Sequence, residues 1–336
     1  MAWRIDKVDK CLKGKSVFVT GATGLIGKAI VTLLLERGAN VYALIRDKSK
    51  ADSAFGLSPD CRLKYVIGDM RNLKAEDMGI DYVIHCASRT ASKDFAASPA
   101  DVLSDIFSGT RNALEFARAN KVSGFAYLST MEVYGASMGG EKIEENSPCY
   151  LDTMNSRSCY PEAKRACECL CASYASQYGV PVKVVRLTQT FGKGVSYDDN
   201  RVFAEFARCV IEGRDIVLKT KGETMRNYVS VDDAAQAVLT ALIYGKSGEA
   251  YNVANEDTYC SVYDMARLVA DNFGCGRIKV RIEEQDVASF GYAPVLKCNL
   301  SARKMLSLGW KPTKGLIEMF AETIKDMKAQ AENCRG

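Results

Sequence analysis

The sequence predicts an α/β protein: a Rossmann-type doubly wound parallel sheet followed by a smaller mixed α/β lobe. Three observations predict this fold class. A short apolar strand, Val17–Val19, leads into regularly spaced glycines and then into a helix. Further apolar runs alternate with helical patterns as far as Leu187, and the pattern loosens beyond it. We therefore expect residues 13–185 to form the sheet domain and residues 186–333 the smaller lobe, with some chain crossing back to the sheet.

The first strand–turn–helix unit carries the strongest local signal. Gly21, Gly24 and Gly27 give the spacing G-x-x-G-x-x-G, rather than the G-x-G-x-x-G of simple dehydrogenases. Glycines here let the backbone approach a pyrophosphate, and the following helix offers free N–H groups and the positive end of its dipole. The apolar face of that helix begins at Leu25. The unit therefore favours a dinucleotide site over a turn that only connects a strand to a helix.

The other elements are predicted from apolar periodicity and from the Gly, Pro and polar clusters between them. In the first half, strands are expected at residues 40–45, 63–67, 81–86, 125–129 and 181–187, and helices at residues 101–120 and 161–178. In the second half, helices are expected at residues 201–213, 231–244, 261–273 and 315–331, and short strands at residues 216–219 and 249–253. The polar stretch 139–158 is expected to be a long loop of the kind that often forms a lid.

Residues that follow the strands of a parallel sheet meet at its carboxyl edge, where ligands bind. Arg46 stands at the end of the second strand, where many NAD-binding sheets place an acidic residue that holds the ribose 2′-hydroxyl. Arg46 can pair instead with the 2′-phosphate of NADP, or it can be a solvated loop residue, and Asp47 can still reach a ribose. The choice between NAD and NADP therefore stays open. Ala87 and Ser88 lie in the turn after the fourth strand.

The composition limits the classes of function. Basic and acidic residues number 45 and 41, for a net charge of +4, which gives no case for binding nucleic acid or an anionic membrane. No apolar run approaches the roughly 20 residues that span a bilayer, and the charged N-terminal stretch lacks the apolar core of a signal peptide. The 13 cysteines form no metal or redox pattern, so we expect reduced thiols in a cytoplasmic protein.

The single histidine, His85, excludes Ser-His-Asp catalysis and multi-histidine metal chemistry, and no metal site is expected. His85 ends an apolar run, so we expect a hydrogen-bonded residue near the core rather than a catalytic group. Acid–base chemistry then falls to Tyr, Lys, Glu or Asp side chains.

Tyr160 and Lys164 supply such a pair, four residues apart on one face of a predicted helix. An ammonium favours a nearby tyrosinate, so we expect Lys164 to lower the pKa of Tyr160 from about 10 toward the working pH. Thr130, which follows the fifth strand, can bind a substrate oxygen and pass its proton to Tyr160. A glycine turn, a threonine at a strand end and a Y-x-x-x-K helix together are a much stronger signal than any one of them.

In these motifs the chain resembles an extended short-chain dehydrogenase/reductase of the NAD-dependent sugar-nucleotide epimerase/dehydratase family. The resemblance covers roughly residues 15–330. S-T-x-E-V-Y-G and R-S-C-Y-x-E-x-K-R look nearest to UDP-glucuronate decarboxylases and dTDP-glucose 4,6-dehydratases. The motifs that carry it are T-G-A-T-G-L-I-G (20–27), G-D-M (68–70), V-I-H-C-A (83–87), L-S-T-M-E-V-Y-G (128–135), S-C-Y-P-E-A-K-R (158–165), R-L-T-Q-T-F-G (186–192), D-D-N-R-V-F (198–203), M-R-N-Y-V-S-V-D-D (225–233) and A-Y-N-V (250–253).

The resemblance implies a nucleotide-sugar substrate, a tightly bound and recycled NAD, and a homodimer formed through the helices near residues 101–120 and 161–178. The implied catalytic residues are Thr130, Glu132, Tyr160 and Lys164. Those expected to bind the cofactor are Gly21, Thr23, Gly24, Leu25, Ile26, Gly27, Arg46, Asp69, Met70, Cys86, Ala87, Ser88, Tyr160 and Lys164. Those expected to bind the substrate are Ser88, Thr130, Glu132, Arg157, Gln189, Arg201 and Arg226.

Departures from the family's patterns bear on the reaction. Met131 stands where the 4,6-dehydratases carry an aspartate that protonates the leaving hydroxyl, and methionine cannot donate that proton. Lys297 is only a partial substitute for the arginine with which decarboxylases handle a carboxylate. Glu132 can be catalytic or structural, and Arg157 can contact the substrate or brace its loop.

Epimerisation makes the fewest demands, because it needs only the three catalytic groups and room for a keto sugar to turn. We therefore expect an NAD-dependent sugar-nucleotide epimerase that acts through a transient 4-keto sugar. The alternatives are an NDP-hexuronate decarboxylase, an NDP-sugar 4,6-dehydratase and, because of Arg46, an NADPH-dependent carbonyl reductase.

Overall fold

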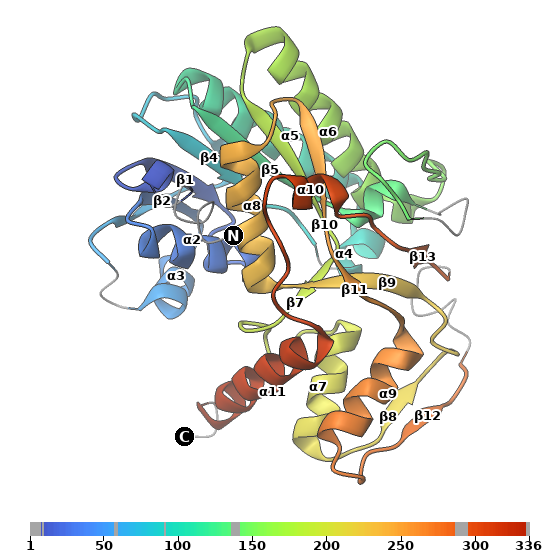
Figure 1. Cartoon of the computed structure of the whole chain (residues 1–336). Coiled ribbons are helices and arrows are strands. Elements are labelled where there is room, and N and C mark those ends of the chain that lie inside the picture. Colours follow the sequence, from blue (N-terminus) through green and yellow to red (C-terminus); the bar gives the residue numbers. More distant parts are fainter. Residues whose placement is uncertain are drawn as a thin grey trace.

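The computed structural model describes residue 8 and residues 10–56, 60–90, 92–135, 142–285 and 295–333. It confirms the predicted fold class, with a seven-stranded parallel sheet in the order β10-β6-β5-β4-β1-β2-β3 (Figure 1). The order reverses between β1 and β4, which is where open α/β sheets bind their ligands. The strands are β1 (Ser16–Thr20), β2 (Asn40–Ile45), β3 (Leu63–Ile67), β4 (Tyr82–His85), β5 (Gly124–Thr130), β6 (Val182–Leu187) and β10 (Glu249–Val253).

Helices cover both faces of this sheet because its strands are apolar on both sides (Figure 1). In β1, Val17 and Val19 face one core and Phe18 faces the other. The first core lies under α2 (Leu25–Glu36), α3 (Lys48–Phe55) and α8 (Val231–Tyr244). The second lies under α4 (Ser92–Ala97), α5 (Pro99–Ala119) and α6 (Cys159–Tyr178).

The second half of the chain forms a lobe beside the sheet (Figure 1). Its core includes Phe191, Phe203 and Phe320, and the first two of these rings stack with centroids 4.6 Å apart. Strands β7 (Gln189–Phe191), β9 (Met225–Ser230), β11 (Asn255–Ser261) and β13 (Lys297–Cys298) form one sheet, and β8 (Ile216–Leu218) pairs with β12 (Val280–Ile282). The helices of this half besides α8 are α7 (Val202–Glu212), α9 (Val262–Phe273), α10 (Arg303–Ser307) and α11 (Leu316–Asn333).

Most predicted elements are present, with ends that differ by at most two residues. Helix α6 begins at Cys159, so Pro161 is its third residue rather than its first. The boundary expected between residues 185 and 186 falls inside β6. β10 and α8, from the second half of the chain, pack with the first sheet. The short elements α3, α4, β7, β9, β11, β12, β13 and α10 were not expected from the sequence.

Part of the expected lid, residues 139–141, lies outside the described residues. The described remainder of that loop contains the short 3₁₀ helix η3 (Ser156–Ser158) immediately before α6. Two further 3₁₀ helices, η1 (Met70–Asn72) and η2 (Met131–Tyr134), follow β3 and β5. None of the helices in the described ranges is long and apolar enough to cross a bilayer.

The prediction for His85 is confirmed, because this residue is 2% exposed and bonded on both ring nitrogens. Its Nδ1 lies 2.7 Å from Thr20 Oγ1, and its Nε2 lies 3.2 Å from Thr110 Oγ1. Burial lowers the pKa of His85 from 6.5 to about 3. The ring therefore stays neutral and joins β4 to β1 and to α5.

The lowered pKa predicts a specific loss of stability in acid. Between pH 6.5 and about pH 3 the unfolded chain binds a proton at His85 that the folded chain does not. This group therefore lowers the unfolding free energy by about 1.4 kcal/mol for each pH unit below 6.5. Urea unfolding of wild type and His85→Asn at several pH values measures the effect, because the chain has no other histidine. The stability advantage of wild type should shrink as the pH falls, and a difference independent of pH would contradict the assignment.

Candidate active site

The turn between β1 and α2 can be built only from glycine at two of its positions. Gly21 has a φ of +65°, and a Cβ there would lie 2.8 Å from the backbone nitrogen of Ala87. A Cβ on Gly27 would lie 2.1 Å from the carbonyl oxygen of Gly21. Gly24 is the N-cap of α2 and provides no side-chain cap, so the first N–H groups of this helix remain available to an anion. Thr23, Leu25 and Ile26 are partly buried beside the turn.

The segment after β4 closes against the same turn. The Ala87 N–H donates to Thr20 Oγ1 at 3.1 Å, which fixes this segment to the end of β1. Burial raises the pKa of the neighbouring Cys86 thiol to about 12, so the thiol stays protonated. The Ser88 hydroxyl is buried and has no hydrogen-bond partner among the described residues. Such an unpaired group is costly unless a ligand or water satisfies it, so it points to a bound molecule at this edge.

The other end of the predicted cofactor site is positively charged. Asp47 caps α3 with its side chain and is therefore engaged. Asp69 accepts hydrogen bonds from the backbone and guanidinium of Arg71, whose Nε lies at 2.9 Å. The exposed Arg46 lies with Nη1 3.9 Å from the same carboxylate. Met70 begins η1 at this edge. Two guanidinium groups thus share one carboxylate beside β2 and β3.

Thr130, Tyr160 and Lys164 come together as predicted. Tyr160 and Lys164 lie one turn apart on α6 and are 7% and 4% exposed. The Thr130 hydroxyl lies near enough to the Tyr160 phenol to lower the pKa of that phenol. Lys164 Nζ donates to the carbonyl oxygen of Leu128 at 2.9 Å and lies 5.9 Å from the centre of the Tyr160 ring. All three groups therefore converge at the carboxyl end of β5.

The expected effect of Lys164 on Tyr160 is wrong for this structure. Burial raises the pKa of Tyr160, the Glu132 carboxylate raises it further, and Thr130 and Arg157 only oppose this in part. Burial also lowers the pKa of Lys164 to about 8. The i, i+4 spacing correctly predicts that the two groups are near each other. It does not reveal that both are removed from water, which disfavours phenolate and ammonium alike.

An aromatic stack that the sequence analysis missed supports Tyr160. Phe95 of α4 stacks on the Tyr160 ring with centroids 4.7 Å apart and an interplanar angle of 16°. The Arg157 guanidinium lies 4.7 Å from the centre of the Phe95 ring, and its Nη2 lies 3.3 Å from Glu132 Oε2. Arg157 therefore braces the site while keeping an ion pair with a candidate catalytic residue. No pattern in the sequence marks Phe95, because α4 is short and was not expected.

The candidate substrate-binding residues of the second half differ in whether their side chains already have hydrogen-bond partners. Both Nε and Nη2 of Arg201 donate to the Asp199 carboxylate, at 3.0 and 2.5 Å, so Arg201 is already engaged. The Nε of Arg226, on β9, is buried and has no hydrogen-bond partner among the described residues. Gln189 begins β7, which pairs with β9. Arg226 is therefore the better candidate to bind an anionic group. The described part of the chain holds no group of side chains suited to a metal ion.

A glycine turn with an uncapped helix N-terminus, beside a buried tyrosine and lysine, is the arrangement of an extended short-chain dehydrogenase/reductase. Comparison with family models specifies the class further. Residues 17–254 match the NAD dependent epimerase/dehydratase family, and the chain belongs to that family. It is therefore an enzyme that acts with NAD. The residues present fit this cofactor, because the N-terminus of α2 has no side-chain cap and can bind a pyrophosphate, and because the buried Ser88 hydroxyl has no hydrogen-bond partner among the described residues.

Relatives of known function span more than one reaction. UDP-glucuronic acid decarboxylase 1 of Xenopus tropicalis is 27% identical over 332 residues, which cover 95% of this chain and 74% of that protein. dTDP-D-glucose 4,6-dehydratase of Homo sapiens is 27% identical over 333 residues, which cover 96% of this chain and 92% of that protein. UDP-glucose 4-epimerase of Thermotoga maritima, solved with UDP-glucose, matches with a TM-score of 0.80 at 22% identity, covering 94% of this chain and 99% of that one. This likeness shows the fold, and the relatives together do not single out one reaction.

The close approach at Gly21 predicts that Gly21→Ala damages the cofactor site. Its Cβ would meet the backbone of Ala87 as well as adopt a positive φ. Gly213→Ala is a matched control, because Gly213 has a φ of +67° with nothing within 4 Å of the added Cβ. The control should lose only about 1–2 kcal/mol of stability for the left-handed backbone. Gly21→Ala should lose more and should bind NADH at least about tenfold more weakly, a cost of about 1.4 kcal/mol. Equal effects of the two variants in thermal melts and NADH fluorescence titrations would contradict this account.

Proposed function

We propose that the protein is a sugar-nucleotide epimerase that acts through a transient 4-keto sugar and recycles its NAD. NAD, held at the glycine turn and the N-terminus of α2, would supply the hydride acceptor and donor for the sugar carbon. Tyr160 takes the proton of the sugar hydroxyl in the first step and gives it back in the last. Thr130 holds the sugar oxygen beside the Tyr160 phenol, whose pKa the Thr130 hydroxyl lowers. Lys164 supplies a buried ammonium on the same face of α6.

The observation that carries the choice of reaction is the position of Met131. This residue is 4% exposed and packs in a small core with Val133, Tyr134 and Leu300. Its sulfur lies 3.4 Å from Thr188 Oγ1. An apolar, buried side chain at this position cannot protonate a leaving hydroxyl group, which argues against dehydration. Oxidation of the sugar carbon to a ketone and its reduction back to an alcohol need no such group.

Decarboxylation of an NDP-hexuronate is the second candidate. The sequence of the Xenopus tropicalis relative and the presence of Glu132 and Arg157 favour it. Against it, Lys297 is exposed, and it stands at the sequence position where those enzymes carry the arginine that binds the substrate carboxylate. An NADPH-dependent carbonyl reductase is the third candidate, which the exposed Arg46 beside Asp69 favours.

For the substrate, we propose that Arg226 binds the diphosphate, since its Nε is buried without a partner in the described chain. Ser88, Thr130, Glu132, Arg157 and Gln189 are proposed to line the sugar site, and Asp69, Met70 and Cys86 the adenine and ribose side of the cofactor site. Arg201 would have to leave Asp199 to contribute. The two halves of the chain, residues 13–185 and 186–333, would then carry cofactor and nucleotide sugar respectively, in a cytoplasmic enzyme.

The reaction is tested by incubating the purified protein with UDP-, dTDP-, CDP- and GDP-sugars and following the products by mass spectrometry and NMR. An epimerase should give a product of unchanged mass with new ring couplings and should need no added cofactor. Loss of carbon dioxide identifies the decarboxylase, and loss of water identifies the dehydratase. Stoichiometric consumption of NADPH identifies the reductase. Any of these three results would overturn the proposed reaction.

Tyr160→Phe tests the proposed base directly. Removing a positioned acid–base group should lower kcat by about 10²–10⁴-fold while leaving NADH binding and the fold in place. Tyr178→Phe is the matched control, because Tyr178 ends the same helix and is 43% exposed. Turnover by Tyr160→Phe at the rate of the control would refute the assignment.

We also propose that the enzyme is a homodimer joined through α5 and α6. Leu103 and Phe107 on α5 are 45% and 38% exposed, which places two large apolar side chains on an uncovered face. Phe107→Glu should therefore yield monomers in sedimentation velocity experiments at concentrations where wild type is dimeric. Val217→Glu is the control, because Val217 is similarly exposed, at 42%, but lies on β8 in the other lobe. A monomeric wild type would rule out the proposed dimer.

A further inference from the structure

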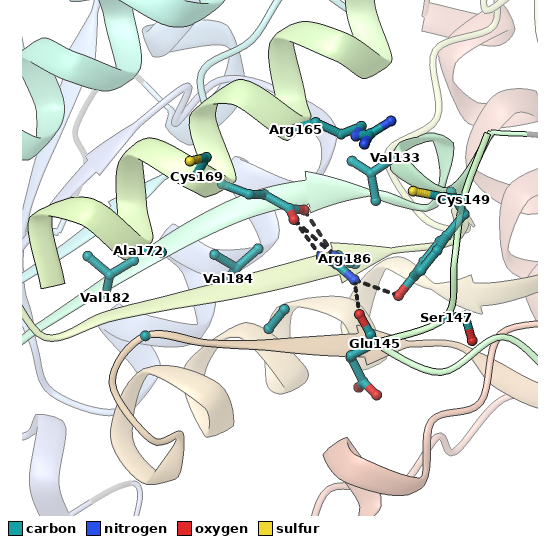
Figure 2. A pocket seen from close by; sticks show the side chains of 14 residues that line it. Val133, Glu145, Ser147, Cys149, Arg165, Cys169, Ala172, Val182, Val184 and Arg186 are labelled. Carbon is teal, nitrogen blue, oxygen red and sulfur yellow. Dashed lines mark hydrogen bonds and ion pairs between the residues drawn. The ribbon is translucent and has the colours of Figure 1, made fainter. Parts of the chain in front are cut away.

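A buried ion pair lies beside the catalytic residues, between α6 and β6. Glu168 follows Lys164 by one turn of α6, and Arg186 is on β6. Their side chains are 12% and 15% exposed. Arg186 donates from Nη2 to Glu168 Oε2 at 2.6 Å and from Nε to Oε1 at 3.0 Å (Figure 2). Two parallel bonds of this kind fix relative orientation as well as distance.

The carboxylate of this pair also holds the end of β5. Ser129 Oγ donates to Glu168 Oε1 at 2.5 Å. Ser129 directly precedes Thr130 in the chain, and Glu168 directly follows the turn of α6 that carries Lys164. One carboxylate therefore connects the strand end that presents Thr130 with the helix that presents Lys164.

The guanidinium reaches the segment that carries Glu132. Arg186 Nη1 donates at 2.8 Å both to the hydroxyl of Tyr134 and to the carbonyl oxygen of Glu145 (Figure 2). Tyr134 ends η2, the short helix that contains Glu132, and its own hydroxyl donates to Asn252 Oδ1 at 2.6 Å. The network therefore spans β5, η2, α6, β6 and β10 without touching the cofactor turn.

Glu168 also acts on Lys164 through its charge. Burial lowers the pKa of Lys164 to about 8, and the charge of the Glu168 carboxylate opposes that shift. The thiols are neutral near pH 7, because burial raises their pKa values, and His85 is neutral because burial lowers its pKa to about 3. The titratable groups that face Lys164 are Tyr160, Cys167, Glu168 and Cys171 from α6, His85 and Cys86 from β4 and its following turn, and Tyr127 from β5.

A cavity of about 360 Å³ borders the ion pair (Figure 2). Glu168, Arg186 and Arg165 are among its lining residues, most of which come from η2, α6, β6, β10 and the loop before α6. Arg165 contacts Glu162, at 3.5 Å, and does not join the network. The cavity gives a small solute access to the place that the Arg186 guanidinium occupies.

We propose that Glu168 and Arg186 are positioning residues: their ion pair holds Thr130 and Lys164 at the separation that proton and hydride transfer require. Stability alone does not explain the pair. A buried ion pair costs desolvation of both charges, and well-packed apolar replacements are often neutral or stabilising. What an apolar pair cannot supply is the set of directed bonds to Ser129 and Tyr134. The inference rests on the proposed hydride chemistry at Tyr160.

The double variant Glu168→Leu/Arg186→Met separates positioning from stability. Its melting temperature should stay near that of wild type, because both charges are removed together. Its kcat should fall about 100-fold, the usual cost of misplacing reacting groups by about 1 Å, with a much smaller change in KM. Retained kcat in a folded double variant would overturn the proposal.

Rescue with a small cation tests the guanidinium itself. Arg186→Ala should lose activity, and methylguanidinium, entering through the cavity, should restore a large part of kcat, whereas neutral methylurea of the same shape should not. Arg165→Ala, which enlarges the same cavity without breaking the network, should keep wild-type activity and ignore both solutes. If Arg186→Ala fails to fold, Arg186→Lys serves instead, since it keeps the charge but loses the two-pronged geometry and should still lower kcat. A folded Arg186→Lys with wild-type kcat, or equal rescue by methylurea, would contradict the proposal.

The pH dependence of kcat/KM in Glu168→Gln distinguishes a positioning role from a purely structural one, because a purely structural role would leave this pH dependence unchanged. Loss of the carboxylate lowers the pKa of Lys164 below about 8, so the alkaline limb of kcat/KM should begin at lower pH than in wild type.

NADH binding, measured by fluorescence titration, tests the positioning role without any sugar. The double variant Glu168→Leu/Arg186→Met should bind NADH about tenfold more weakly, as expected when a charge-assisted contact from Lys164 is lost. If wild type binds NADH but converts no nucleotide sugar, the proposed function fails while this test still stands. Unchanged NADH affinity in the double variant would overturn the positioning role by itself.

Discussion

The buried ammonium of Lys164 is the constraint on which the rest of the site depends. Removing an ammonium from water is expensive, and the fold compensates with a 2.9 Å bond to the Leu128 carbonyl and with the face of Tyr127, 4.8 Å from Nζ to the ring centre. Both partners belong to β5. Helix α6 can therefore satisfy its lysine only when it lies in one register against that strand. The register that buries Lys164 also places Tyr160 beside Thr130.

The same burial keeps the Tyr160 phenol protonated in the protein alone. Its raised pKa reflects lost hydration and the nearby Glu132 carboxylate, which Arg157 partly neutralises. Base chemistry therefore depends on charges and hydrogen bonds that a bound dinucleotide and substrate bring to the cleft. The enclosed, stacked position of Tyr160 against Phe95 limits its motion, so its phenol stays directed at Thr130. Deprotonation of Tyr160 is therefore expected only in the occupied site, because the phenolate is disfavoured until cofactor and substrate fill the cleft.

The sequence predicts those parts of the molecule whose signals are local. The sheet, the glycine turn and the Y-x-x-x-K face follow from short-range periodicity and spacing, and they appear where expected. The second lobe was predicted less well, because β7, β9 and β13 are two to six residues long and pair with strands far away in sequence. Glu168 and Arg186 had weak signals in retrospect: a glutamate between cysteines on a buried helix, and an arginine inside an apolar strand. What no local pattern carries is the burial that sets the pKa values of Tyr160 and Lys164.

A series of direct contacts connects the proposed base, Tyr160, with the Glu132 carboxylate. Glu132 is held by Arg157, Arg157 lies on Phe95, and Phe95 lies on Tyr160. A substrate group that draws Arg157 away from Glu132 would free that carboxylate and at the same time remove a cation from the stack over Tyr160. A sugar carboxylate would do so, whereas a neutral hydroxymethyl group would leave the ion pair closed. The Glu132–Arg157 pair therefore couples the charge of the bound sugar to Tyr160, because Glu132 raises the pKa of its phenol and Arg157 lowers it.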